Sequence, residues 1–223
     1  MKKEFKRPLS LVEAAMEGIR GSVIKGELGL GQQLTETYLT ELFSLSKTPI
    51  REALARLKSE GLVVSEVHKG FKVFEMDEQD LSEFCELRLA LESQALRSAY
   101  KINRLELIRE LKYLIKDFHE SIKNEDLAKY KLTDTKFHKT FFKFSSNRFL
   151  TNNYENINSI IETIRTHADA TLFKNNKLND SINDHISIYN HVEGKNLGLA
   201  LDELEKHINS WHDNRIIKSR IIL

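Results

Sequence analysis

Proline and glycine are distributed so unevenly along these 223 residues that they constrain the fold more than any other feature. Both prolines and most of the nine glycines precede residue 75. Because these residues interrupt helices and mark turns, their scarcity beyond that point predicts long helices with short connections. Hydrophobic residues make up 40% of the chain and charged residues 30%, which is typical of a folded core rather than disorder.

The region before residue 75 shows the pattern of a helix-turn-helix. Apolar residues at helical spacing predict an amphipathic helix over residues 9–25. A short second helix follows Thr35, its expected N-cap, and a third follows Ser46 and ends at Gly61. Two short helices joined by a tight turn, the second beginning with polar and basic residues, are typical of this motif.

Lys47, Thr48 and Arg51 lie at the start of that third helix, the end that enters the major groove in helix-turn-helix proteins. Arg51 can contact guanine with two parallel hydrogen bonds, and the helix N-terminus attracts a phosphate. A predicted hairpin follows, with strands over residues 62–66 and 71–74 and a turn that contains Lys69. Each basic residue alone fits a solvated surface, but the order of helix, helix and hairpin favours a winged helix-turn-helix that binds DNA.

Residues 8–75 resemble the GntR family of regulators. The similarity is carried by the string Ser46-Lys47-Thr48-Pro49-Ile50-Arg51-Glu52-Ala53-Leu54, together with Glu60-Gly61-Leu62 and Gly70-Phe71-Lys72-Val73. The chain departs from the family at Leu30, Ser44 and Lys47, where Pro, Gly and Arg are usual, and Lys47 keeps the charge but lacks the planar fork. The resemblance implies that DNA is contacted by Ser46, Lys47, Thr48, Arg51, His68, Lys69 and Gly70.

The region after Met76 contains six apolar stripes at helical spacing, which predict six amphipathic helices packed as an antiparallel bundle. The predicted fold is therefore mainly α, with a winged helix-turn-helix domain over residues 1–76 and an all-helical domain over residues 77–223.

Polar side chains interrupt the apolar stripes of the bundle at four positions. Asp134 and His138 are four residues apart, so they share a helix face with neighbouring aromatic residues. His185 and His207 lie beside the stripes of two later helices. One carboxylate and three imidazoles suit zinc, nickel or manganese. However, histidines 119, 167 and 212 also lie near apolar stripes, and a single such histidine is usually a hydrogen-bonded core residue.

Residues 77–215 resemble the FCD ligand-binding domain of the FadR subfamily, in a short six-helix form. The matching residues are Glu86-Leu87-Arg88 with Glu92, Asp134-x3-His138, Asn147-Arg148-Phe149-Leu150, Asp184-His185 and His207-Ile208. The resemblance implies a divalent metal, zinc first, bound by Asp134, His138, His185 and His207. It also implies a small carboxylate effector near Arg88, whose alternative is a surface salt bridge with Glu92. Arg165 is a further effector candidate.

We therefore expect a homodimeric repressor that binds a pseudo-palindromic DNA operator under the control of this effector. Two alternatives remain from the residues alone: a metal-dependent enzyme built on the four-residue site, and a regulator whose metal is structural or is itself the signal. The single Cys85 and the absence of a long apolar run predict a cytoplasmic protein without a membrane span. The net charge of +1 excludes none of these classes.

Overall fold

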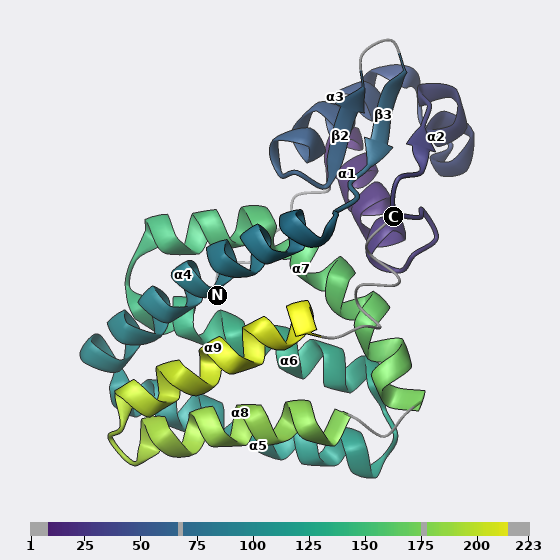
Figure 1. Ribbon diagram of the computed structural model, residues 1–223. Coiled ribbons are helices and arrows are strands. Elements are labelled where there is room, and N and C mark those ends of the chain that lie inside the picture. Colours follow the sequence, from purple (N-terminus) through teal and green to yellow (C-terminus); the bar gives the residue numbers. More distant parts are fainter. Residues whose placement is uncertain (1–8, 67–68, 175–177, 214–223) are drawn as a thin grey trace, which may run out of the picture. The chain divides into compact units, whose positions relative to one another are not determined.

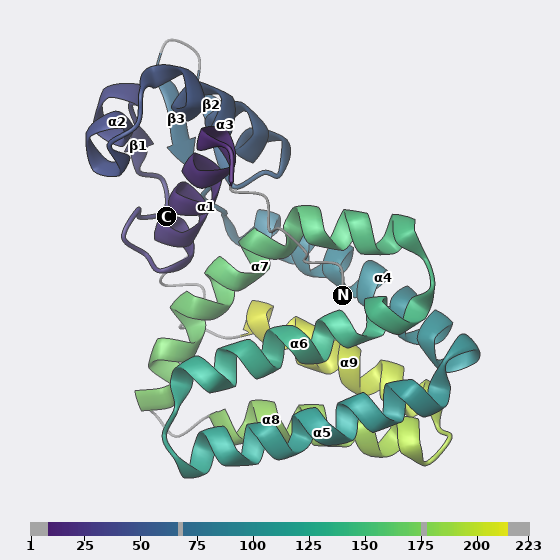
Figure 2. The same ribbon diagram turned by 180° about the vertical axis from the view of Figure 1, so that it is seen from behind.

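The computed structural model describes residues 9–66, 69–174 and 178–213, apart from the side chains of residues 167–179, 212 and 213. The chain divides into two compact units, Met1–Glu75 and Met76–Leu223. Each unit is described by itself below, and Figures 1 and 2 show the elements of both. No helix in the described ranges is both long and apolar enough to span a lipid bilayer.

The N-terminal unit contains three helices, α1 (Leu11–Ile24), α2 (Glu36–Phe43) and α3 (Lys47–Ser59). Ser10 begins α1 with a capping box, in which its hydroxyl accepts a hydrogen bond from the Glu13 amide. Thr35 caps α2 as the sequence predicts, because its hydroxyl accepts from the Tyr38 amide at 3.1 Å. All three helices pack through aliphatic side chains that are fully buried, among them Ile19, Leu39, Ile50, Leu54 and Leu57.

The turn between α2 and α3 differs from the prediction in one respect. Ser46 occupies the N-cap position of α3, but its hydroxyl makes no capping hydrogen bond. The turn is closed instead by Ser44, which adopts the left-handed conformation with φ 52° and ψ 41°. Glycine adopts this conformation without a Cβ penalty, so the serine at this position carries backbone strain.

A three-stranded antiparallel sheet completes the N-terminal unit. The predicted hairpin is present as β2 (Val63–Glu66) and β3 (Gly70–Val73), with Val63 opposite Val73. The sequence analysis missed β1 (Gln33–Leu34), which pairs with the other side of β3 and gives the order β1-β3-β2. Two residues are too few to show the alternation by which a strand is recognised.

Six helices make up the described part of the C-terminal unit, as the stripes predict. They are α4 (Glu78–Ile102), α5 (Arg104–Lys123), α6 (Leu127–Ser145), α7 (Arg148–Lys174), α8 (Leu178–Glu193) and α9 (Leu197–Asp213). Helix α6 packs against both α4 and α5, and α9 packs against both α4 and α8. The inner face of α6 is therefore covered by neighbouring helices, so a polar side chain on that face is removed from water.

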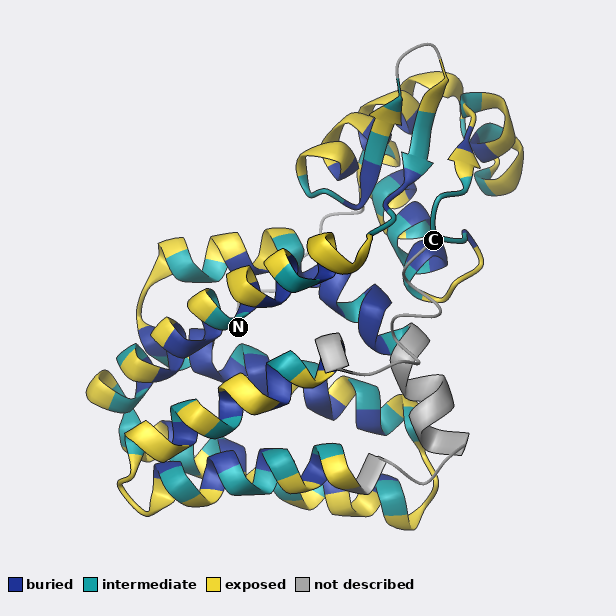
Figure 3. Cartoon of the chain, in the orientation of Figure 1, coloured by how far each residue is buried: buried dark blue, intermediate teal, exposed yellow. Residues whose placement is uncertain are grey.

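The inner face of α6 combines large aromatic side chains with polar ones. Phe137, Phe141 and His138 are fully buried, and Asp134 is 4% exposed. Figure 3 shows the same alternation of buried inner faces and exposed outer faces along the other helices. Burial of a phenylalanine contributes roughly 1.5–3 kcal/mol, which helps to offset the cost of burying the polar groups. The fold therefore stabilises a polar cluster in the middle of an apolar bundle.

Candidate functional site

The start of α3 presents the predicted DNA-contacting residues to solvent. Lys47, Thr48 and Arg51 are all exposed, and Ser46 before them is exposed as well. Arg51 is held by Glu36 of α2, with Nε 2.8 Å from Oε1 and Nη2 2.9 Å from Oε2. The exposed N-terminal turn of α3, with its amides free of intrahelical partners, is suited to a phosphate.

The hairpin supplies the second part of this surface. The Lys69 side chain is 71% exposed and lies 4.0 Å from the Glu66 carboxylate. Gly70 adopts φ +88°, and a Cβ at this position would meet nothing within 4 Å. His68, the third residue predicted here, lies outside the described residues.

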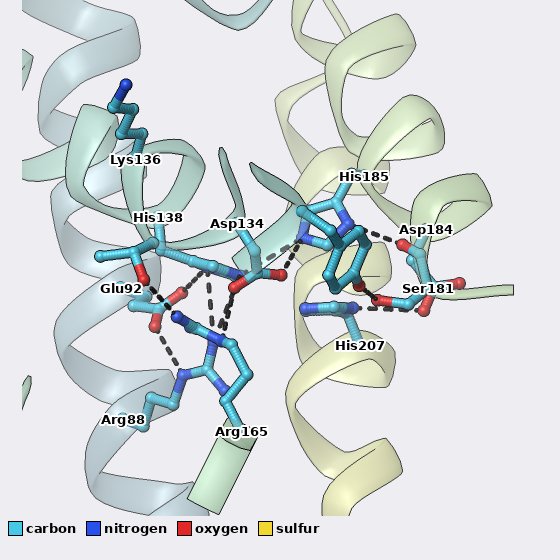
Figure 4. A network of polar contacts seen from close by, with 12 residues as sticks. Arg88, Glu92, Asp134, Lys136, His138, Arg165, Ser181, Asp184, His185 and His207 are labelled. Carbon is cyan, nitrogen blue, oxygen red and sulfur yellow. Dashed lines mark hydrogen bonds and ion pairs between the residues drawn. The ribbon is translucent and has the colours of Figure 1, made fainter. Parts of the chain in front are cut away.

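A buried polar cluster lies inside the C-terminal unit (Figure 4). Asp134 and His138 of α6, His185 of α8 and His207 of α9 each place one potential ligand atom within 4.8 Å of all the others. Sequence periodicity placed Asp134 and His138 on an inner face and His185 and His207 beside apolar stripes, but only the packing of α6, α8 and α9 brings the four together. By contrast, His119 is exposed on α5, and the side chains of histidines 167 and 212 lie outside the described set.

The three imidazoles of the cluster are oriented by hydrogen bonds at their Nδ1 atoms. His185 Nδ1 donates to the Ser181 carbonyl at 2.6 Å, and Ser181 also accepts from Tyr130 through its hydroxyl at 2.9 Å. His138 Nδ1 donates to Glu92 Oε2 at 2.6 Å, and His207 Nδ1 lies 3.2 Å from Asp184 Oδ2. Such contacts turn the Nε2 atom toward a metal and raise its basicity.

The Nε2 atom of His185 faces two other potential ligand atoms of the cluster. His185 Nε2 lies 3.4 Å from His138 Nε2 and 3.1 Å from Asp134 Oδ1. Because the Ser181 carbonyl only accepts, the neutral ring of His185 carries its proton on Nδ1 and a lone pair on Nε2. Two ligands bound tetrahedrally at 2.0–2.1 Å are about 3.4 Å apart. The spacing and chemistry of these atoms therefore fit a divalent cation among them.

Two buried ion pairs surround the cluster. Arg88 Nε lies 2.7 Å from Glu92 Oε1, and both side chains are fully buried. Arg165 Nε lies 2.6 Å from Asp134 Oδ2, although the approach lacks hydrogen-bond geometry and this oxygen accepts no hydrogen bond from a described residue. The two arginines and two carboxylates balance in charge.

The pKa values of the cluster reflect burial and these pairs. Burial lowers the pKa of His138 to about 3, an effect that the nearby Glu92 carboxylate only partly opposes. Burial also lowers the pKa of His207. Burial raises the pKa of Glu92, but the combined opposite effect of Arg88 and His138 is larger and lowers this pKa to about 2. At neutral pH the carboxylate is therefore ionised, while His138 and His207 are neutral and available as ligands.

Arg88 is fully buried, which does not agree with the surface salt bridge considered as the alternative to its effector role. The predicted pairing with Glu92 exists, but it is fully buried rather than on the surface. The guanidinium lies 4.3 Å from the ring centroid of Trp211, Nη2 lies 3.3 Å from His138 Nε2, and Nη1 is buried with no hydrogen-bond partner in the described structure. Glu92, Ser181 and Asp184 orient the cluster, a role that the sequence analysis missed. For Glu92 the signal was its position one turn after Arg88.

A groove of about 470 Å³ lies elsewhere, between α4 and α9, and is lined by Glu86, Arg97 and Glu205 among others. None of the four cluster residues lines it.

Comparison with known proteins identifies both units. Residues 11–73 match the profile of bacterial regulatory proteins of the gntR family, and residues 83–210 match the FCD domain. The chain is 27% identical over 202 residues to an HTH-type transcriptional regulator of Bacillus subtilis, YdhC, covering 90% of this chain and 88% of the relative. It is also 26% identical over 167 residues to the gluconate operon transcriptional repressor of the same organism, covering 72% and 68%.

Solved structures share the fold. Escherichia coli McbR/YncC superposes with a TM-score of 0.74 at 20% identity, covering 95% of this chain and 99% of that one. A GntR-type protein from Rhodococcus has the same TM-score at 17% identity, covering 94% and 98%. The family matches agree with the winged helix-turn-helix and the helical bundle described above, and the chain belongs to the gntR family of bacterial transcriptional regulators, as a member with an FCD domain.

Proposed function

We propose that this regulator is a homodimeric repressor that places one α3 helix on each half of a pseudo-palindromic operator. The exposed start of α3 and the exposed Lys69 support the DNA-binding surface. Relatives named as repressors of the gluconate operon and of a D-xylose utilization operon support repression. A two-fold dimer matches the symmetry of such an operator. Because the family consists of regulatory proteins, the alternative of a metal-dependent enzyme has no support.

We infer that Asp134, His138, His185 and His207 hold a divalent metal ion, with zinc as the first expectation and nickel or manganese as alternatives. The observation that carries this inference is the set of facing acceptors, in which His185 Nε2 lies 3.1 Å from Asp134 Oδ1 and 3.4 Å from His138 Nε2. A bound metal would act as a Lewis acid toward an oxygen ligand. The protein supplies the orientation, since Nδ1 of each imidazole already contacts an oxygen.

The charge balance of the cluster supports an anionic effector. Arg88 and Arg165 are matched by Glu92 and Asp134, so a divalent cation leaves two excess positive charges in a buried site. A carboxylate compensates part of this charge, and Arg88 Nη1 provides a buried donor for it. Arg165 adds positive charge next to Asp134. We therefore propose a small carboxylate as the effector, which controls operator binding through its different affinities for two states of the dimer.

DNA binding is tested by fluorescence anisotropy with a labelled duplex from the regulator's own upstream region. Arg51→Ala should weaken specific binding roughly 10- to 100-fold, and Lys47→Ala should reduce the salt dependence by about one phosphate contact. Lys58→Ala is the matched control, because Lys58 is exposed at the other end of α3. Equal effects of all three substitutions would contradict the proposed surface.

Metal binding is tested by measuring zinc content in the wild type, in His185→Ala and in His119→Ala. We expect one zinc per chain in the wild type and in the His119 control, and a loss in the His185 variant. Zinc retained by His185→Ala would contradict the site.

Effector binding is tested with the single tryptophan of the chain, Trp211, which lies against Arg88. Its fluorescence should change when D-gluconate or another small mono-, di- or tricarboxylate enters the site. Operator release should accompany this change in the wild type and fail in Arg88→Met. If His185→Ala loses the metal but still releases DNA normally, the metal is structural or a separate signal.

A further inference from the structure

The contact between Arg51 and Glu36 has a geometry that the DNA-binding role alone does not explain. Two parallel bonds join the guanidinium to the carboxylate, at 2.8 Å from Nε and 2.9 Å from Nη2. Glu36 is the first residue of α2 and directly follows the Thr35 cap, so its backbone position is well defined. This carboxylate therefore restrains an arginine side chain that is 67% exposed and otherwise has wide rotameric freedom.

A contribution to the free energy of folding does not explain this ion pair well. Exposed ion pairs typically contribute little to that free energy, and a bidentate pair such as this one belongs at the upper end of that small range. Moreover, a carboxylate beside a surface that approaches DNA repels the phosphates. The hydrogen bond from Arg51 lowers the pKa of Glu36, so the negative charge persists at neutral pH. Glu36 therefore opposes DNA binding electrostatically, yet it binds Arg51, the main candidate for contacts with bases. A role in orienting the Arg51 side chain explains this arrangement better than a role in stability.

The geometry also determines which donors of Arg51 remain. A guanidinium has five N–H groups, and the edge formed by Nε and Nη2 is occupied by Glu36. The edge formed by Nη1 and Nη2 faces away from that carboxylate. It carries two parallel donors, the arrangement that matches O6 and N7 of guanine in the major groove. Partial neutralisation by Glu36 also reduces the attraction of Arg51 for phosphates of any sequence.

We propose that Glu36 is a positioning residue that aims the Nη1–Nη2 edge of Arg51 at a guanine and thereby raises the selectivity of the regulator for its operator over other DNA. This inference rests on the proposed DNA-binding role of Arg51. It assigns to Glu36 a positive effect on specific binding and a negative effect on binding to DNA of unrelated sequence.

The test uses full-length Glu36→Gln and two duplexes: one selected from a random library by the wild-type protein, and a scrambled version of it. The dissociation constant for each duplex is measured over a range of salt concentrations. We expect the ratio of scrambled to selected dissociation constants to fall roughly 10-fold in Glu36→Gln, with tighter binding to the scrambled duplex. Glu52→Gln, which removes the same charge from the exposed neighbour of Arg51, should tighten binding to both duplexes and leave the ratio unchanged.

A double-mutant cycle separates positioning from a change in α2 itself. In an Arg51→Ala background, Glu36→Gln should no longer alter the ratio, and circular dichroism should show an unchanged helix content. If the ratio falls equally in that background, or if Glu36→Gln behaves like Glu52→Gln, the proposal is wrong while Arg51 keeps its role. If Arg51→Ala itself leaves the ratio unchanged, the proposed role of Arg51 fails first.

Discussion

Substitution of Glu92 by glutamine perturbs the buried cluster with almost no change in volume. In the wild type, Oε1 lies 2.7 Å from Arg88 Nε and Oε2 lies 2.6 Å from His138 Nδ1, and all three side chains are fully buried. The amide retains one acceptor, so it can satisfy one of these two donors but not both. The Arg88 charge then loses its counter-ion at a fully buried position.

The expected loss follows from this burial. Removing one partner of a buried ion pair costs roughly 3–5 kcal/mol, because the remaining charge is uncompensated. For a chain of this size, that loss lowers the melting temperature by roughly 6–20 °C. His138 also exchanges its carboxylate acceptor for a neutral amide oxygen or for none, so zinc affinity should fall roughly 10- to 100-fold.

Thermal and urea denaturation in the presence of EDTA measure the loss of stability, and zinc titration measures the loss of zinc affinity. Glu155→Gln is the matched control: Glu155 pairs with Lys139 at 2.9 Å but is half exposed, so its stability should barely change. The double variant Arg88→Met/Glu92→Leu should recover most of the lost stability. A loss below about 1 kcal/mol in Glu92→Gln would refute the reasoning that Arg88 depends on this counter-ion.

Three further outcomes are expected from the backbone and the titrating groups. Ser44→Gly should stabilise the N-terminal unit by roughly 1 kcal/mol in thermal denaturation, since glycine relieves the left-handed strain at φ 52°; a destabilised variant would contradict this. Gly70→Ala should destabilise the hairpin by roughly 1 kcal/mol through its φ of +88° alone, because a Cβ there meets no neighbour; unchanged stability would show that the strain is absent. The metal-free protein should lose stability as the pH falls below about 6.5, the pKa of unfolded histidine, because burial lowers the pKa of His138 to about 3 and also lowers that of His207. His138 alone contributes a slope of about 1.4 kcal/mol per pH unit between about pH 6.5 and its lowered pKa, which urea titrations at stepped pH can measure, and His138→Gln should remove this contribution.

The helical periodicity, the caps and the turn residues were sufficient to predict the elements that depend on local chemistry. The hydroxyl of Thr35, the apolar stripes after Met76 and the hairpin around Lys69 act over a few residues, so their consequences appear in the sequence pattern. The four cluster residues were also named as a set, but through the resemblance to the FCD domain, because helical periodicity alone did not separate His185 and His207 from the other histidines near apolar stripes.

Only the tertiary structure decided whether those four residues meet, because Asp134, His185 and His207 lie on three helices whose packing no local pattern specifies. The same packing placed the pair of Arg88 and Glu92 in the interior, although i,i+4 spacing alone equally suits a surface pair. It also brought Glu36 of α2 against Arg51 of α3, fifteen residues away. Local interactions determine which segments are helices and strands, whereas the burial of a charge and the direction of a donor depend on neighbours that are distant in the chain.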